Sequence, residues 1–524
     1  MASMGFIKNK TQETKQPNAL VPLNFTHAHA IGQTGCGKTS SFIYPNLSYR
    51  IKKNHSILLF DFKGKEHLAL KYFASIHQKE DKVIEIGKPW GAKINLLRMM
   101  SPNTLERFVE TMIGTDAKDP YWPKSATRLF LNLFSVIKYI EKIHHSLQIE
   151  KDKQRFKKYM NFEDELEYID STYPTVATFN SVLHIAQNEE NLAAFVGNLG
   201  QLTRRIDDFF YECLYNKHQE KKESSKLVIK KFAQPLKYYI ELKKVISITQ
   251  NKLSGYEKVN GENPKISIIM NLAPLNVIAN DESLNTDGYN IIDALNTGAL
   301  ISINTRDMSD EFAQGLSTAI FSELSKRSLL SELQPISVFI DEAQRVMNKG
   351  SDYSLDVLRE CKVELFLAYQ NKELMEDKLG ETKYKALKQN LSSSFYFRNE
   401  ESTLEIQTNE LKDFEAFSTK NGFQKSLLFR PIFIKQDALF EVEQNYLQKL
   451  GVYKTYQLQY YKETHTIVYD KLNFEDEKII LFDIKTKKSR LKTFIKRSES
   501  TATYRFAMQM YRQAQEHSKK TLNY

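Results

Sequence analysis

The sequence predicts an α/β protein with a mostly parallel sheet that is interrupted by an inserted all-α domain. Three observations support this fold class. Short apolar runs typical of strands alternate with amphipathic helical patterns at both ends of the chain, the stretch between them is mostly helical in pattern, and a glycine-rich loop follows the first strand. The chain has 524 residues, enough for two to four domains.

We expect four segments along the chain. Residues 1–100 and 266–440 form the two parts of a nucleotide-binding domain, residues 101–265 form the inserted all-α domain, and residues 441–524 form a β-rich extension with a final helix.

The first part of the sheet is expected from apolar runs that are each followed by a turn or helix, as parallel strands with crossover helices require. These runs are Ala28–Ile31, Ser56–Asp61 and Lys82–Ile86. Spacing of apolar residues at three and four positions predicts the helices of the insertion. These helices are Leu105–Ile113, Ser125–Ile143, Val176–Ala186 and Leu236–Thr249.

Strand patterns resume after the insertion and complete the sheet. They are Ala299–Asn304, Ile336–Ile340, Glu364–Tyr369 and Ser393–Phe397. The extension has an alternating stretch, a strand pair and a polar helix. These are Tyr453–Tyr469, then Lys478–Ile484 with Leu491–Ile495, then Ala502–Ser518.

The strongest local signal is a phosphate-binding loop that begins at Gly32. It matches G-x-x-x-x-G-K-[ST] in full, between a strand and a helix, which predicts a P-loop NTPase core of the RecA-like kind. Glycines let the backbone wrap a phosphate so that its N–H groups face the anion. Lys38 is expected to bridge the β- and γ-phosphates of ATP and Thr39 to hold Mg²⁺. The expected nucleotide-binding residues are Gly32, Gln33, Thr34, Gly35, Cys36, Gly37, Lys38, Thr39 and Ser40.

Two carboxylates close a later strand and supply the other half of an ATPase site. Asp341 and Glu342 follow the apolar run Ile336–Ile340, at the strand end where open α/β sheets bind ligands. We expect Asp341 to orient the Mg²⁺ shell and Glu342 to polarise the attacking water. Gln370 ends the next strand and is expected to sense the γ-phosphate or orient water; the alternative is a solvated strand end.

Several separate blocks together resemble the type IV coupling proteins, the hexameric ATPases of conjugation and type IV secretion (TraG/TraD-like) within the HerA/FtsK superfamily of motors. The stretch Asp61–Glu66 resembles the family's Asp-x-Lys-Gly-Glu segment, with Lys65 as a departure before the acid. The other matching blocks are Gly32–Thr39 with Tyr44–Leu47, Asn95–Leu97, Tyr121–Trp122 with Ala126, Asp341–Ala343, Arg359 with Gln370, and Gln389–Asn390 with Phe395–Arg398.

The resemblance implies an ATP-driven ring, a homo-hexamer with the nucleotide between subunits. An arginine from the neighbouring subunit would complete each site, and Arg359 is the candidate; the alternative is an ordinary surface arginine. Implied partners are DNA, a relaxase or effector protein, and secretion-channel components. Family members also carry an N-terminal membrane segment, so the resemblance implies the cytoplasmic face of the inner membrane if an anchor precedes this chain, and the cytoplasm otherwise.

Two other functions compete with a coupling ATPase. One is a double-stranded DNA translocase of the same superfamily without a secretion role, and the inserted helical domain favours the coupling protein over it. The other is a docking module that keeps the nucleotide fold without hydrolysing ATP. The presence of Lys38, Thr39, Asp341 and Glu342 argues against that module.

The charge and composition of the chain are compatible with each of these functions and do not distinguish between them. The net charge of +10 favours polyanionic partners such as nucleic acid or anionic lipid. Two lysine-rich stretches, 221–258 and 485–497, are either partner-facing or solvated. Three scattered cysteines fit a reducing compartment, and Cys36 is read as a tolerated small residue rather than a redox switch. No apolar run reaches the ~20 residues that span a bilayer.

Overall fold

The computed structural model describes residues 18–114, 121–152, 162–221, 238, 241–247, 264–329, 332–348, 353–399, 408–419 and 426–452, and four strands beyond them. The chain divides into two compact units, Met1–Phe433 and Ile434–Tyr524. The nucleotide-site residues expected from the sequence all belong to the first unit.

The first unit is built on a nine-stranded sheet with the order β3-β4-β2-β5-β6-β1-β7-β8-β9. The strands are β1 (His27–Ile31), β2 (Ser56–Asp61), β3 (Val83–Ile86), β4 (Leu300–Asn304), β5 (Ile336–Asp341), β6 (Val363–Tyr369), β7 (Leu391–Phe397), β8 (Glu415–Ser418) and β9 (Leu427–Leu428). The first seven in spatial order run parallel, β8 is antiparallel to β7, and β9 is antiparallel to β8. The predicted α/β class with a mostly parallel sheet is confirmed.

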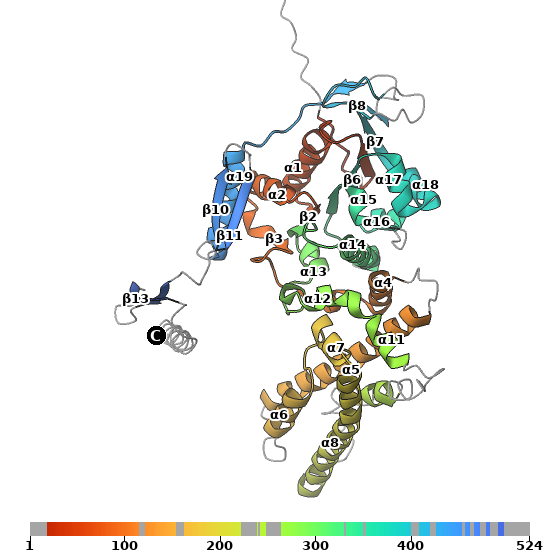
Figure 1. Ribbon diagram of the computed structural model, residues 1–524, viewed down its shortest axis with the longest axis vertical. Helices are drawn as coiled ribbons and strands as arrows, with labels where there is room; N and C mark the ends of the chain where they lie inside the picture. Colours follow the sequence, from red (N-terminus) through yellow and green to blue (C-terminus); the bar gives the residue numbers. More distant parts are fainter. Residues whose placement is uncertain are drawn as a thin grey trace, which may run out of the picture. The chain divides into compact units, whose positions relative to one another are not determined.

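Helices cover both faces of the parallel strands (Figure 1). Because crossovers between parallel strands are right-handed, α1 and α2 lie on one face and α14 to α18 on the other. Their bounds are α1 (Tyr44–Lys52), α2 (Glu66–Ile76), α13 (Ile291–Asn296), α14 (Asp310–Leu324), α15 (Ala343–Val346), α16 (Leu355–Glu360), α17 (Lys372–Leu379) and α18 (Glu381–Asn390). The central strands β1, β2, β5 and β6 are buried at every position, as a sheet covered on both faces requires.

A helical segment separates β3 from β4, although these strands are neighbours in the sheet. Its helices are α3 (Leu96–Met99), α4 (Pro102–Ile113), α5 (Tyr121–Asp152), α6 (Phe162–Thr172), α7 (Phe179–Ile185), α8 (Glu189–Lys221), α11 (Pro264–Met270) and α12 (Asn276–Ala279). The buried Phe108 of α4 joins it to the core: its ring centroid lies 5.7 Å from that of Phe179 in α7 and 6.4 Å from that of Phe312 in α14. This packing fixes the insertion to a helix of the nucleotide-binding core.

The second unit contains α19 (Gln436–Leu450) and two antiparallel strand pairs. The strands are β10 (Tyr456–Tyr461), β11 (Thr466–Lys471), β12 (Lys478–Phe482) and β13 (Leu491–Lys496). The predicted helix Ala502–Ser518 and most of the lysine-rich stretch 221–258 lie outside the described residues. Within the described part of the chain, no helix combines the length and apolar character of a membrane span.

Candidate nucleotide-binding site

The site lies at the carboxyl edge of the sheet, where strand order brings its parts together. Strand β6 lies between β1, which leads into the phosphate loop, and β5, which ends in Asp341. Gln370 at the end of β6 is therefore placed between the loop and the acidic pair, and the Gly32 N–H donates to the carbonyl of Tyr369 at 3.3 Å. Segments separated by some 300 positions thus meet at one edge.

The phosphate loop adopts the backbone that its glycines allow. Gly35 and Gly37 have φ angles of +85° and +97°, a region that side chains disfavour. The buried Lys38 ammonium turns into the loop, and its Nζ donates to the carbonyl oxygens of Gly32 at 2.5 Å and Gln33 at 3.0 Å. The lysine side chain is therefore hydrogen-bonded to the backbone of its own loop.

The residues after the lysine begin with a wide turn. Thr39–Ile43 is a π-helix that leads into α1, a type of turn frequent at functional sites. Cys36 is fully buried, and burial raises the pKa of its thiol despite the nearby Lys38. A buried thiol with a raised pKa is a poor nucleophile, which agrees with the interpretation of Cys36 as a small filling residue.

Sequence reasoning gave no role to a later segment that packs against the loop. The Phe414 N–H donates to the Cys36 carbonyl at 2.9 Å, and the Ile432 N–H donates to the Ser40 carbonyl at 2.8 Å. The Phe414 ring lies so close to Gly37 that an added Cβ would be 2.3 Å from its Cδ1. No sequence pattern links these positions, because the contact is set by the hairpin that follows β7.

Thr39 and Asp341, the two residues expected to serve Mg²⁺, are hydrogen-bonded to each other. The Thr39 hydroxyl donates to Oδ2 of Asp341 at 2.7 Å. Oδ1 of Asp341 is buried without a hydrogen-bond partner among the described residues, so the carboxylate retains an oxygen for a further ligand. A hydroxyl and a carboxylate are the hard oxygen donors that Mg²⁺ prefers, and these residues therefore fit the expected ion.

Glu342 is held in a strained and well-defined position. Its φ of +75° is rare for a residue with a side chain, and its N–H donates to the Ala368 carbonyl at 3.0 Å. Oε2 accepts from Nε2 of Gln344 at 2.6 Å and from Nε2 of Gln370 at 3.3 Å. The strand-end glutamine Gln370 is thus beside the proposed base, and Gln344 is an additional contact that the sequence did not indicate.

Lys63 is the main site residue that sequence reasoning missed. Its Nζ lies 2.6 Å from Oδ2 of Asp341 and 3.4 Å from Oε1 of Glu342. Burial lowers the pKa of this ammonium, but the carboxylates of Asp341 and Glu66 outweigh burial and hold the pKa above its ordinary value. The signal was the Asp-x-Lys-Gly stretch, whose lysine had been matched without being given a role.

The turn that carries Lys63 is organised by Asp61. Oδ1 of Asp61 accepts the N–H groups of Gly64 at 2.6 Å and Lys65 at 3.1 Å, and Oδ2 accepts the N–H of His67 at 3.1 Å. Burial would raise the pKa of Asp61, yet the hydrogen bonds from Glu66 and His67 lower it overall. Burial and the hydrogen bond shared with Asp61 raise the pKa of Glu66 well above its ordinary value.

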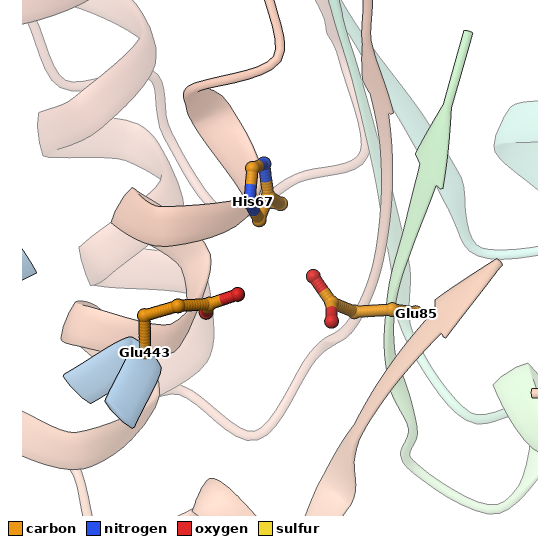
Figure 2. Close-up of side chains that lie close together, drawn as sticks. All are labelled: His67, Glu85 and Glu443. Atoms are coloured by element: carbon orange, nitrogen blue, oxygen red, sulfur yellow. The ribbon is translucent and has the colours of Figure 1, made fainter. Parts of the chain in front are cut away.

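His67 and Glu85 form a second group of buried polar side chains near this turn. Figure 2 shows His67 from α2 and Glu85 from β3 with their side chains close together. Nζ of Lys71 forms an ion pair with Oε1 of Glu85 at 2.8 Å, and Nε1 of Trp90 donates to Oε2 at 2.8 Å. Lys71 from α2 therefore joins that helix to Glu85 of β3 through a buried ion pair.

Arg359 is not brought to this site. It is an exposed residue of α16, which enters β6 from the opposite edge of the sheet. Seven residues of strand separate its end of β6 from Gln370, a distance of roughly 20 Å. Arg359 therefore cannot contact the nucleotide site of its own chain.

Searches for similar proteins gave matches among solved structures alone. No protein-family model and no curated protein matches the sequence. The plasmid coupling protein TrwB, in complex with a non-hydrolysable GTP analogue, matches at 13% identity and a TM-score of 0.45, covering 78% of this chain and 87% of that one. TrwB with ADP and Mg²⁺ matches at 14% and 0.42, covering 81% and 91%. VirB4 of Thermoanaerobacter pseudethanolicus matches at 10% and 0.40, covering 79% and 91%.

Proposed function

We propose that this protein is a magnesium-dependent ATPase of the P-loop class. The observation that carries the proposal is that the phosphate loop, with Lys38 and Thr39, and the acidic strand end, with Asp341 and Glu342, lie together at the carboxyl edge of one sheet. The hydrogen bond from Thr39 to Asp341 joins them. The strand end follows the loop by some 300 residues in the sequence.

Each residue has a distinct task in this proposal. The loop N–H groups and Lys38 bind the phosphates, and Thr39 and Asp341 hold Mg²⁺, which supplies positive charge against the charge that develops during phosphoryl transfer. Glu342 takes the proton of the attacking water, and its rigid backbone fixes where that proton is received. Gln344 and Gln370 hold one oxygen of Glu342, which leaves the other turned toward the site.

The finer proposal is a coupling ATPase of conjugation or type IV secretion. It drives DNA, with or without an attached relaxase, or an effector protein toward a secretion channel, as a hexameric ring at the inner membrane. The sequence blocks that resemble this family and the helical insertion support it. A double-stranded DNA translocase without a secretion role is the alternative, and DNA transfer in cells that lack the chain would separate the two.

The test of the ATPase proposal uses two site variants. Lys38→Ala should weaken ATP binding at least 100-fold, because the phosphates lose their buried cation. Glu342→Gln should bind ATP within about threefold of the unaltered chain but lose 10²- to 10⁴-fold in turnover. Nucleotide binding is measured by calorimetry and turnover by phosphate release.

Matched changes outside the site serve as controls. Lys52→Ala alters an exposed lysine of α1, and Glu360→Gln alters an exposed glutamate of α16; both should leave binding and turnover unchanged. Normal turnover in Glu342→Gln would remove that residue from the base role, and normal binding in Lys38→Ala would overturn the site.

A further inference from the structure

Lys63 lies on a turn whose backbone is held in place by several contacts. The turn that carries it is tied at three N–H groups by the buried Asp61. Gly64, the next residue, has a φ of +73° and lies beneath Arg306, so that an added Cβ would be 3.1 Å from the arginine side chain. The lysine is therefore presented to the site by a rigid loop.

The ammonium of Lys63 lies between the two carboxylates that the proposed reaction uses. It contacts Oδ2 of Asp341, the oxygen that also accepts from Thr39, and it faces Oε1 of Glu342. Lys38, the other cation of the site, is engaged with loop carbonyls on the far side. Lys63 thus lies 3.4 Å from Oε1 of Glu342, the oxygen that takes the proton of the attacking water in the proposed reaction.

The position of the Lys63 ammonium places it next to the space that the terminal phosphate of ATP would occupy. A terminal phosphate must lie between the Thr39–Asp341 pair, which holds its metal, and Glu342, which activates the water that attacks it. That space borders the Lys63 ammonium, since the ammonium already touches both carboxylates. A doubly charged phosphate competes well with a carboxylate for a lysine.

We propose, on the basis of the proposed ATPase function, that Lys63 is a γ-phosphate-binding residue that distinguishes ATP from ADP. With ATP in the site, its ammonium exchanges the Asp341 oxygen for an oxygen of the γ-phosphate. With ADP it keeps the carboxylate contact. Because Asp61 ties the lysine to the start of α2, the exchange transmits the nucleotide state to the β2–α2 turn.

The test compares two nucleotides in a Lys63→Met variant. Affinities for ADP and for the β,γ-imido analogue of ATP are measured by calorimetry, with Mg²⁺ and again in EDTA. The analogue should bind roughly 10- to 100-fold more weakly than to the unaltered chain, the usual effect of losing one hydrogen bond between charged groups. ADP affinity should change by less than about threefold.

Lys65→Met is the matched control, because it removes the same charge from an exposed position two residues along the same turn. It should change neither affinity. Lys63→Gln repeats the measurement should the methionine variant melt early. An equal loss for both nucleotides, or no loss for the analogue, would overturn the sensing role while leaving the ATPase proposal intact. An unaltered chain that binds neither nucleotide would overturn both.

Discussion

At the scale of single residues, a buried ion pair fixes the helix that follows the phosphate loop. Arg50 of α1 makes a two-pronged contact with Glu364 of β6, with N–O distances of 2.8 and 3.0 Å, and both side chains are fully buried. The hydroxyl of Ser337 donates to the same carboxylate at 2.6 Å. The pair therefore joins the helix after the loop to β6, the strand that precedes Gln370.

Breaking this pair should destabilise the protein more than removing it. Arg50→Met leaves a buried carboxylate without its cation and should lower the free energy of unfolding by about 3–5 kcal/mol, whereas the double variant with Glu364→Leu should recover much of the loss. Urea unfolding followed by tryptophan fluorescence measures both. Arg50 also donates to the carbonyls of Val21 at 2.8 Å and Pro22 at 3.0 Å. A double variant as unstable as Arg50→Met would show that these contacts matter more than the ion pair.

The same pair makes stability depend on pH in a defined direction. Burial raises the pKa of Glu364, but the hydrogen bonds from His55 and Arg50 outweigh it and hold the pKa below the ordinary value of 4.5. A carboxyl with a lowered folded pKa stabilises the fold above its unfolded pKa and loses that contribution as the pH falls through the folded pKa. Glu364→Gln should therefore flatten the loss of stability below about pH 4.5.

At the scale of elements, the phosphate loop depends on a hairpin far along the chain. The ring of Phe414 covers Gly37, and the backbone of the 408–433 segment is hydrogen-bonded to the loop at Cys36 and Ser40. The loop is thus held between its own helix and a β8–β9 hairpin. Its geometry needs glycine for two reasons, the positive φ and the close aromatic ring.

Comparing Gly37→Ala with a control variant at Gly114 should separate the effect of the positive φ from that of the close aromatic ring. Gly37→Ala faces both a φ of +97° and a clash with Phe414, so we expect loss of measurable ATP binding and a lower melting temperature. Gly114→Ala is the control for φ alone, since Gly114 has a φ of +78° with nothing within 4 Å. It should cost only about 1–2 kcal/mol of stability and leave ATP binding intact. Unchanged ATP binding in Gly37→Ala would contradict the packing argument.

At the scale of the whole molecule, the position of Arg359 makes assembly testable. This exposed residue lies at the sheet edge opposite to its own phosphate loop, so any catalytic role needs a second subunit. In a ring, an arginine from the neighbour raises turnover by ~10³ to 10⁵ in other P-loop enzymes.

Mixing two inactive variants tests this arrangement. Arg359→Ala and Lys38→Ala subunits should each be inactive, but together they should recover some ATP hydrolysis, because interfaces with an intact loop on one side and an intact arginine on the other form in the mixture. Lys362→Gln, an exposed cation three residues away, should behave like the unaltered chain. Complete failure of the mixture would count against Arg359.

Much of the fold followed from local pattern. The expected strand Ser56–Asp61 has the bounds found for β2, and the other expected strands of the sheet agree with theirs to within two residues. Helix ends were harder to place: α5 spans Tyr121–Asp152 rather than Ser125–Ile143, because packing of its apolar face extends the helix into polar flanks that carry no periodicity. Thr39 and Asp341 could both be assigned to one edge of the sheet from the sequence, because each lies at the end of a parallel strand or just beyond it.

The sequence by itself determined the phosphate loop, the acidic strand end and the α/β class, because these depend on residue type and local spacing. Only the tertiary structure decided that Lys63 faces Asp341, that Phe414 covers Gly37 and that Arg359 lies at the far edge. Strand order, and not strand pattern, sets these three outcomes. A parallel sheet can be wound in several orders from the same strands, and long-range packing selects one.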